Sequence, residues 1–388
     1  MAEKIRMGMV GGGKGAFIGA IHRLAANIAG DIDLVAGAFS RDAAASKEFG
    51  VNELGLDGAR AYGSYQEMFD AENALPEDQR IQCVSIVTPN DTHAPVSIAA
   101  LEAGFHVICD KPLAGTLDDA LAIEAAVKKS GKLFGLTQTY TGYPLVMQAR
   151  AMVASGEIGS IRRVAVSYLQ DWLSKAEDTG SSKQSSWRTD PSRSGESGAF
   201  ADIGTHAFNL VEYMTGERIT DVAAELRSVI EGRAIDDDGQ AMFRLSGGGS
   251  GLLSASQVCS GAINALKIEI YGDKASLHWQ QEQPNELIVK TRGKPEQILR
   301  PGANMPFLTD RALANCRTPG GHPEGYIEAF ANIYGAFASA VKKFPDTEPE
   351  PGFTTIEDGI ATMRFIRAAV NSSNNKSAWT ALSGVENS

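Results

Sequence analysis

The chain has 388 residues, of which 43% are hydrophobic and 21% charged, and its formal net charge is −11. Because one hydrophobic core rarely serves more than about 250–300 residues, this length predicts two domains. The negative charge disfavours binding to nucleic acid, no apolar run reaches the roughly 18 residues of a membrane span, and the N-terminus resembles no secretory signal, so we expect a cytoplasmic protein.

The first part of the chain alternates short apolar runs with segments of helical period. This pattern predicts an α/β domain over residues 1–137, a Rossmann-type parallel sheet with helices on both faces. The clearest helix begins after Thr116, which can cap it with Asp119, and ends at Gly131. The expected strands are Ile5 to Val10, Ile32 to Phe39, Cys83 to Val87, His106 to Cys109 and Leu133 to Thr137.

A glycine-rich turn follows the first expected strand and leads into an apolar-periodic helix. In this order, strand, glycines and helix let a pyrophosphate lie on the N–H groups at the helix N-terminus. We therefore predict an NAD(P) site, with a purely structural turn as the alternative. Either Gly15 or Gly19 could be the third glycine of the motif. The residues expected to hold the dinucleotide here are Gly11, Gly13, Gly15, Ala16, Phe17, Ile18 and Gly19.

The end of the second expected strand bears on the choice between the two dinucleotides. An acidic residue there would bind the ribose 2′-OH of NAD, whereas this chain has Ser40 and Arg41. A guanidinium in that place favours the 2′-phosphate of NADP. Asp42, one residue later, keeps NAD open.

The pattern changes after residue 137 and predicts a second domain over residues 138–388. Strand-like segments with few helices between them indicate an α+β domain with a large, mostly antiparallel open sheet. The expected strands are Ile161 to Leu169, Val222 to Ile230, Gln240 to Leu245, Leu252 to Val258, Ala265 to Tyr271 and Leu287 to Lys290. The expected helices are Leu145 to Ala154, Glu324 to Lys343 and Ile356 to Val370. An open sheet leaves one face to be covered, so we expect a homodimer or homotetramer formed through that face.

Two features could suggest a metal site, and neither has the required pattern. The four cysteines are scattered, without metal-ligand spacing or a disulfide framework. The acidic run Asp236-Asp237-Asp238 is expected to be a solvated hairpin turn, because no second carboxylate cluster accompanies it. We therefore expect no metal.

Three separated motifs resemble those of the Gfo/Idh/MocA family of NAD(P)-dependent sugar and polyol oxidoreductases. The motifs are Thr88-Pro89-Asn90-Asp91-Thr92-His93, Cys109-Asp110-Lys111-Pro112-Leu113-Ala114 and Asp202-Ile203-Gly204-Thr205-His206. The resemblance implies a Rossmann domain, an open-faced sheet domain, a tightly held NAD(P), and oxidation of a secondary alcohol or its reverse. It also implies that Lys111 touches both cofactor and substrate, that Asp202 and His206 join it from the second domain, and that Pro112 follows a cis peptide bond.

The chain departs from the family pattern at two places. Asp110 stands where the family has a glutamate, and the shorter carboxylate has a different reach. The glycine turn is also longer than usual, since five residues separate Gly13 from Gly19.

Elementary chemistry supports the roles that the resemblance implies for Lys111, Asp202 and His206. Hydride leaves a carbinol carbon only if the hydroxyl proton is removed, and a histidine suits that transfer, so His206 is the expected general base. The Lys111 ammonium would stabilise developing alkoxide character, and Asp202 would face the same site. The alternatives are a structural histidine, an ordinary lysine at a strand end, and an aspartate that caps the following helix.

The remaining site residues follow from strand ends and loops. Cofactor contacts are also expected from Thr88, Pro89, Asn90, His93, Asp110, Lys111 and Pro112, which lie past the carboxyl ends of strands. Substrate contacts are expected from Lys111, Tyr140, Trp187, Arg188, Asp202, His206 and His322. The long segment from Ser174 to Ser197 is interpreted as a lid or a substrate loop.

The sequence therefore predicts a dehydrogenase that oxidises a secondary hydroxyl of a sugar, glycoside or inositol. One alternative is a non-catalytic, nucleotide-sensing binding protein on the same scaffold. Another is an oxidoreductase whose cofactor stays bound while two carbohydrates react in turn.

Overall fold

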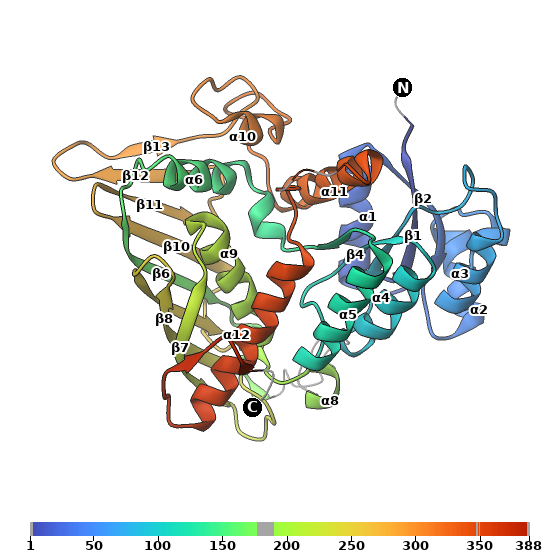
Figure 1. Ribbon diagram of the computed structural model, residues 1–388, viewed down its shortest axis with the longest axis horizontal. Helices are drawn as coiled ribbons and strands as arrows, with labels where there is room; N and C mark the ends of the chain where they lie inside the picture. Colours follow the sequence, from blue (N-terminus) through green and yellow to red (C-terminus); the bar gives the residue numbers. More distant parts are fainter. Residues whose placement is uncertain (1–2, 177–189, 347, 349, 386–388) are drawn as a thin grey trace. The chain divides into compact units, whose positions relative to one another are not determined.

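The computed structural model describes residues 3–176, 190–346, 348 and 350–385, which form two compact units (Figure 1). Unit 1 comprises Met1–Thr139 and Phe330–Ile360, and unit 2 comprises Tyr140–Ala329 and Ala361–Ser388. The sequence placed every residue after 137 in the second domain, whereas the structure returns Phe330–Ile360 to unit 1. Among the described residues, no helix has the length and apolarity to cross a membrane.

Unit 1 is built on a five-stranded parallel sheet, as expected, with the order β2-β1-β3-β4-β5. The strands are β1 (Ile5–Gly11), β2 (Ile32–Ala38), β3 (Cys83–Val87), β4 (His106–Cys109) and β5 (Phe134–Leu136). Each expected strand is present. The strand order reverses between β1 and β3, and ligands of such sheets bind where the carboxyl ends meet at this reversal.

The helices of unit 1 cover both faces of this sheet. They are α1 (Phe17–Ala29), α2 (Ala43–Glu48), α3 (Tyr65–Asn73), α4 (His93–Glu102), α5 (Leu117–Ser130) and, for most of its length, α11 (Tyr326–Lys343). Helices α3, α4 and α5 pack in a row. The α5 caps are as expected, because the Thr116 hydroxyl accepts from the N–H of Asp119 and Gly131 has a φ of 65°.

Helix α11 supplies part of the core of unit 1, which explains why the chain returns there. The buried rings of Tyr334 and Phe337 come from this helix, and Phe337 packs edge-on against Phe353. A Cβ on Gly135 of β5 would lie 3.0 Å from both phenylalanine rings. This close fit makes the late segment an integral part of unit 1.

Unit 2 is built on a nine-stranded sheet with the order β13-β12-β11-β10-β6-β9-β8-β7-β14 (Figure 1). The strands are β6 (Ile161–Leu169), β7 (Ile219–Arg227), β8 (Asp238–Leu245), β9 (Ser250–Ser256), β10 (Ala265–Gly272), β11 (Ala275–Gln280), β12 (Leu287–Thr291), β13 (Gln297–Leu299) and β14 (Thr380–Ala381). Its strand pairs are antiparallel except for β6 with β9. The mostly antiparallel sheet predicted for this region is confirmed.

Helices cover one face of the nine-stranded sheet. They are α6 (Pro144–Ala154), α9 (Thr205–Thr215) and the later part of α12 (Ile356–Asn374). Phe208 of α9 stacks on Phe365 of α12 with ring centroids 4.6 Å apart, and the Ser372 hydroxyl accepts from the N–H of Ala224 in β7. The short helices are α8 (Pro191–Ser194) and α10 (Asp310–Ala314), and the remaining helical turns are η1 (Phe49–Glu53), η2 (Gly58–Arg60), η3 (Asn90–Thr92), η4 (Thr139–Gly142) and η6 (Phe200–Gly204).

Candidate functional site

The glycine turn between β1 and α1 is folded tightly against its surroundings. Gly11 and Gly12 have φ values of 86° and 71°, which favour glycine. A Cβ on Gly13 would lie 2.4 Å from the carbonyl oxygen of Phe39, and one on Gly19 would lie 2.3 Å from the Cα of Gly12. Only glycines fit these positions, so the backbone of the turn stays accessible at the start of α1. This arrangement fits the pyrophosphate of a dinucleotide.

The contact between Gly12 and Gly19 answers the question of the third glycine. Gly19 packs the helix onto the turn, whereas Gly15 has no atom within 4 Å of its added Cβ. Gly12 is not among the cofactor residues expected from the sequence. Its signal was present, because Gly12 is the middle of three consecutive glycines after a strand.

The other residues of the turn have different surroundings. Phe17 begins α1 with 64% of its side chain exposed, whereas Ile18 packs against the buried cluster of Met9, Phe39 and Val87. Ala16 precedes the helix and donates its N–H to the carbonyl of Gly13 at 3.0 Å. Ile18 therefore anchors the start of α1, next to the glycine turn, on this buried cluster.

Arg23 of α1 holds the glycine turn, a contact that the sequence did not predict. Its guanidinium donates to the carbonyl of Gly12 at 2.8 Å and lies 5.5 Å from the ring centre of Phe49. Burial lowers the pKa of Arg23 from its ordinary value. An arginine in the second turn of a helix has no sequence signal for such a contact, because its partner is a backbone carbonyl.

The end of β2 presents polar side chains to solvent. Ser40 and Arg41 are both exposed, and the Ser40 hydroxyl accepts from the N–H of Asp42 at 3.1 Å. The Asp42 carboxylate caps α2 by accepting from the N–H of Ala45 at 3.0 Å. The one acidic side chain of this group is thus engaged in a helix cap.

The motif from Thr88 to His93 follows the carboxyl end of β3. Pro89 and Asn90 enter the short turn η3, and the Thr92 hydroxyl donates to the carbonyl of Pro89 at 2.8 Å. His93 was expected to contact the cofactor. Its ring is fully buried, and its two nitrogens lie against backbone carbonyls. His93 is therefore placed to hold the backbone at Thr88 and Pro112.

The motif from Asp110 to Pro112 follows the carboxyl end of β4, next to β3 in the sheet. The Lys111–Pro112 peptide bond is cis, as the resemblance implied. Asp110 accepts from the Thr137 hydroxyl at 2.9 Å. Burial alone would raise the pKa of Asp110, but the nearby His22, Lys111 and His93 outweigh it and hold that pKa well below its ordinary value.

A buried polar chain lies behind Asp110. His22 of α1 has its Nε2 3.5 Å from an oxygen of Asp110 and its Nδ1 2.7 Å from the hydroxyl of Tyr334. That hydroxyl lies 2.8 Å from the Ser85 hydroxyl of β3. This row of polar contacts joins α1, α11 and β3 to the motif that contains Lys111. Its residues come from such distant parts of the sequence that no local pattern predicts the contacts.

The third motif forms the junction of η6 and α9 in unit 2. Asp202 lies in η6 and His206 in the first turn of α9. Asp202 does not cap α9, which was the alternative interpretation. The N-cap residue of α9 is Gly204, and no side chain caps this helix. The Asp202 carboxylate instead accepts from the Gln257 side-chain amide at 2.8 Å.

Aromatic residues surround His206. The Tyr140 ring meets its imidazole edge-on at 4.8 Å, and the Tyr168 ring lies 6.1 Å away. The two tyrosine hydroxyls are hydrogen-bonded to each other, and Tyr168 donates to Asn264 at 2.6 Å. Burial raises the pKa of both tyrosines well above its ordinary value. The structure thus brings Tyr140, Asp202 and His206 into one region of unit 2, together with Gln257, Tyr168 and Asn264, which sequence reasoning missed.

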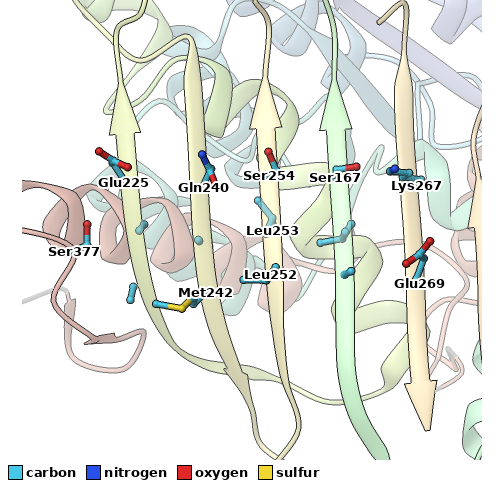
Figure 2. Close-up of a pocket in the computed structure, with 15 residues that line it drawn as sticks. Ser167, Glu225, Gln240, Met242, Leu252, Leu253, Ser254, Lys267, Glu269 and Ser377 are labelled. Atoms are coloured by element: carbon cyan, nitrogen blue, oxygen red, sulfur yellow. The ribbon is translucent and has the colours of Figure 1, made fainter. Parts of the chain in front are cut away.

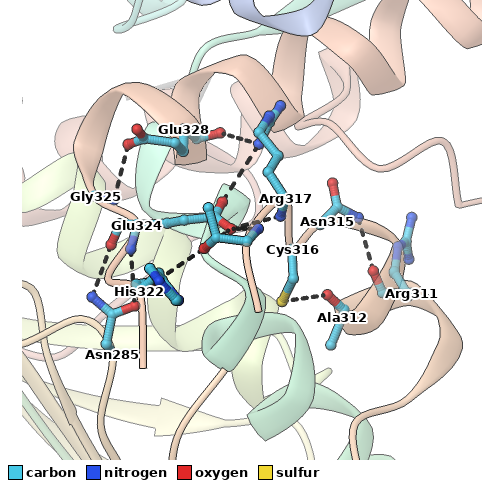
Figure 3. A network of polar contacts seen from close by, with 11 residues as sticks. Asn285, Arg311, Ala312, Asn315, Cys316, Arg317, His322, Glu324, Gly325 and Glu328 are labelled. Carbon is cyan, nitrogen blue, oxygen red and sulfur yellow. Dashed lines mark hydrogen bonds and ion pairs between the residues drawn. The ribbon is translucent and has the colours of Figure 1, made fainter. Parts of the chain in front are cut away.

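His322 lies in the loop between α10 and α11 (Figure 3). Its side chain is exposed, and its Nδ1 lies 3.2 Å from the carbonyl of Pro319. The Glu324 carboxylate organises this loop by accepting from the backbone N–H groups of Arg317 and Thr318 at 2.6 and 2.8 Å. Trp187 and Arg188 lie outside the described residues.

Comparisons with known proteins agree with this geometry. A sequence model described as an oxidoreductase family with an NAD-binding Rossmann fold matches residues 5–138. A second, described as the GFO/IDH/MocA C-terminal domain, matches residues 146–278. The chain is 38% identical to the oxidoreductase YfiI of Bacillus subtilis, over 98% of this chain and 97% of that protein.

Two further proteins extend the comparison. A solved inositol dehydrogenase homologue of Azotobacter vinelandii, complexed with NAD+, has a TM-score of 0.93 and 37% identity, with 98% of each chain covered. Levoglucosan dehydrogenase of Pseudarthrobacter phenanthrenivorans is 32% identical, over 61% of this chain and 65% of that protein. The similarity to the first spans nearly the full length of both chains.

Proposed function

Because this chain belongs to the GFO/IDH/MocA family of oxidoreductases, we propose that it oxidises a secondary hydroxyl of an inositol, sugar or glycoside to a ketone, or catalyses the reverse reaction. The chain is an NAD(P)-dependent oxidoreductase acting on CH–OH groups. The observation that carries the finer proposal is the placement of three chemical groups. Lys111 follows the carboxyl end of β4, at the same edge of the parallel sheet as the glycine turn after β1, and Asp202 and His206 share the η6–α9 junction of unit 2.

Each of these groups has a role in removing hydrogen from a carbinol. A bound nicotinamide supplies the hydride acceptor. His206 accepts the hydroxyl proton at an imidazole nitrogen, and the Lys111 ammonium stabilises the oxygen as negative charge develops on it. Asp202, fixed by Gln257, orients the substrate from the same helical junction as His206.

The polar groups around His206 support a polyol as the substrate. Tyrosine hydroxyls and the amides of Gln257 and Asn264 offer both donors and acceptors, which a ring bearing several hydroxyls can use. Tyr140 supplies an aromatic face for the ring. A relative complexed with myo-inositol has a TM-score of 0.90 with 36% identity, which makes an inositol the first substrate to try.

The end of β2 supports the use of NADP. Arg41 is exposed where a 2′-phosphate would lie, and the carboxylate of Asp42 is engaged in the cap of α2. An Arg41→Ala variant should raise the KM for NADP about tenfold and leave the KM for NAD near that of the wild type. Equal changes in both KM values, or none, would remove Arg41 from cofactor selection.

The face of the nine-stranded sheet that none of the described helices covers supports a homodimer or homotetramer (Figure 2). Met242 and Leu252 are 49% and 44% exposed there, beside the small side chains of Ala165 and Ala223. Small residues let two sheets approach closely, and the face carries both a cation, Lys267, and carboxylates, Glu225 and Glu269, so it is compatible in charge with a second copy of itself. The occupant we propose is therefore a second copy of the chain.

The test is turnover of inositols, aldoses and glycosides with NAD and NADP, followed by the absorbance of reduced cofactor. His206→Ala should lower kcat about 100-fold, in line with a general base, while dinucleotide affinity stays near that of the wild type. The control is His278→Ala, which removes a histidine of β11 in the same unit. Full turnover by His206→Ala would exclude the proposed mechanism.

Two other outcomes favour the alternative functions. Tight dinucleotide binding without turnover of any substrate would indicate a nucleotide sensor. Cofactor that survives gel filtration and is reduced by one carbohydrate and reoxidised by another would indicate a permanently bound cofactor.

A further inference from the structure

His93 is placed between the carboxyl ends of two adjacent strands of unit 1. It begins α4, and its ring is completely buried. Its Nδ1 lies 2.8 Å from the carbonyl oxygen of Pro112, just beyond β4, and its Nε2 lies 2.9 Å from that of Thr88, just beyond β3. One ring therefore connects the backbone just after β3, at Thr88, with the backbone just after Lys111, at Pro112.

The chemistry of these two contacts determines the charge of the ring. A carbonyl oxygen can only accept a hydrogen bond, so each ring nitrogen of His93 must donate. A neutral imidazole carries one N–H and would place a bare lone pair against the second carbonyl. Both contacts are satisfied only when the ring carries two protons and a positive charge.

A buried cation requires a nearby negative charge, and Asp110 provides one. His93 contributes to the electrostatic stabilisation of the Asp110 carboxylate, together with His22 and Lys111. The short segment of Asp110, Lys111 and Pro112 is thus held on both sides of the lysine. Asp110 faces His22 before it, and the Pro112 carbonyl binds His93 after it.

We propose that His93 is a doubly protonated positioning residue that sets where Lys111 presents its ammonium group. His93 itself touches neither substrate nor cofactor in this assignment and acts through the Pro112 carbonyl. The kinetic part of the inference rests on the proposed role of Lys111, whereas the charge of the ring does not.

The charge is tested by nitrogen NMR on protein labelled with 15N-histidine at pH 7. The signals of His93 are assigned by their loss in His93→Asn, and both nitrogens should show the shifts of protonated nitrogens. His106 is the internal control, because its Nδ1 accepts from the N–H of Leu133 at 3.0 Å and must be bare. A bare nitrogen on His93 would overturn the assignment.

The positioning role is tested by a double-mutant cycle. His93→Asn should lower kcat about tenfold or more in the wild-type background and less than twofold in Lys111→Ala, because the lysine is the group that His93 positions. His106→Asn, which removes a buried histidine at the other end of β4, should leave kcat unchanged. Equal losses from His93→Asn in both backgrounds would show a merely structural effect and overturn the role.

The two failures are distinguishable. If Lys111→Ala alone retained the wild-type kcat, the proposed catalytic role of the lysine would fall, and the positioning role with it. The nitrogen shifts would still decide the charge of His93.

Discussion

At the scale of the residue, the two buried histidines near opposite ends of β4 differ in the backbone hydrogen-bonding groups that face their rings. His93 meets two carbonyl oxygens, whereas His106 accepts a backbone N–H. Burial, together with the positive charge of Lys132, lowers the pKa of His106 to about 4. The same residue type thus serves as a cation in one place and as a neutral acceptor in the other.

The lowered pKa of His106 predicts a pH dependence of stability. An unfolded histidine takes up a proton near pH 6.5, and the folded one resists until about pH 4. His106 therefore favours the folded state fully above pH 6.5, and this contribution is lost as the pH falls towards 4, by roughly 3 kcal/mol in total. His106→Asn should flatten the free energy of unfolding over that range in denaturant titrations. The exposed His322→Asn is the control, and an unchanged slope in His106→Asn would contradict the prediction.

At the scale of the element, the acidic run before β8 shows what local patterns miss. Asp236 and Asp237 were expected in a solvated turn, but the structure buries Asp237 and half-buries Asp236. Asp236 accepts from the backbone N–H groups of Gly198 and Phe200 at 2.7 and 2.9 Å, and Asp237 accepts from that of Val229 at 2.7 Å. Both carboxylates thus accept hydrogen bonds from backbone N–H groups of other segments. Asp236 binds residues near the start of η6, and Asp237 binds a residue just after β7. The expected solvated turn is therefore wrong.

Asp236 anchors the start of η6, so it should affect the substrate side of the enzyme. Asp236→Asn replaces an acceptor with a donor and leaves a backbone N–H of Gly198 or Phe200 unsatisfied, which costs about 1–3 kcal/mol. We expect kcat/KM for the carbohydrate to fall about tenfold while dinucleotide affinity is unchanged, since Asp202 follows Phe200 closely. Asp238→Asn, in the same run but outside this cap, is the matched control. Loss of dinucleotide binding in Asp236→Asn would contradict a role confined to unit 2.

Elements with a strong local pattern could be predicted, and those defined by long-range contacts could not. The strand, glycines and helix of the nucleotide site and the capped helix α5 are local, and they were found from the sequence. Strands β13 and β14 were missed, because their pairing partners rather than their own sequence define them. For the candidate site, the motifs predict Lys111 and His206, whereas Arg23 and Gln257 are placed by tertiary contacts alone.

At the scale of the whole molecule, the uncovered sheet face leads to a prediction about assembly. Met242→Asp together with Leu252→Asp should convert the oligomer to a monomer in light scattering at micromolar concentration, because charges would be buried against the second copy. Val51→Asp is the control, since Val51 is 40% exposed but lies in unit 1. A wild-type protein that is already monomeric would contradict the proposal.

Because residues 330–360 belong to unit 1, no single cut in the chain separates the two units. A fragment ending at Thr139 would lose Phe337, Phe353 and the Tyr334 partner of His22, and would expose the apolar groove that they fill. We expect such a truncation to aggregate, and a chimera that joins residues 1–139 to 330–360 through a flexible linker to remain monodisperse and bind dinucleotide. The chain passes from unit 1 to unit 2, returns to unit 1 and ends in unit 2, so the nucleotide-binding unit has to be grafted or exchanged as two pieces of chain.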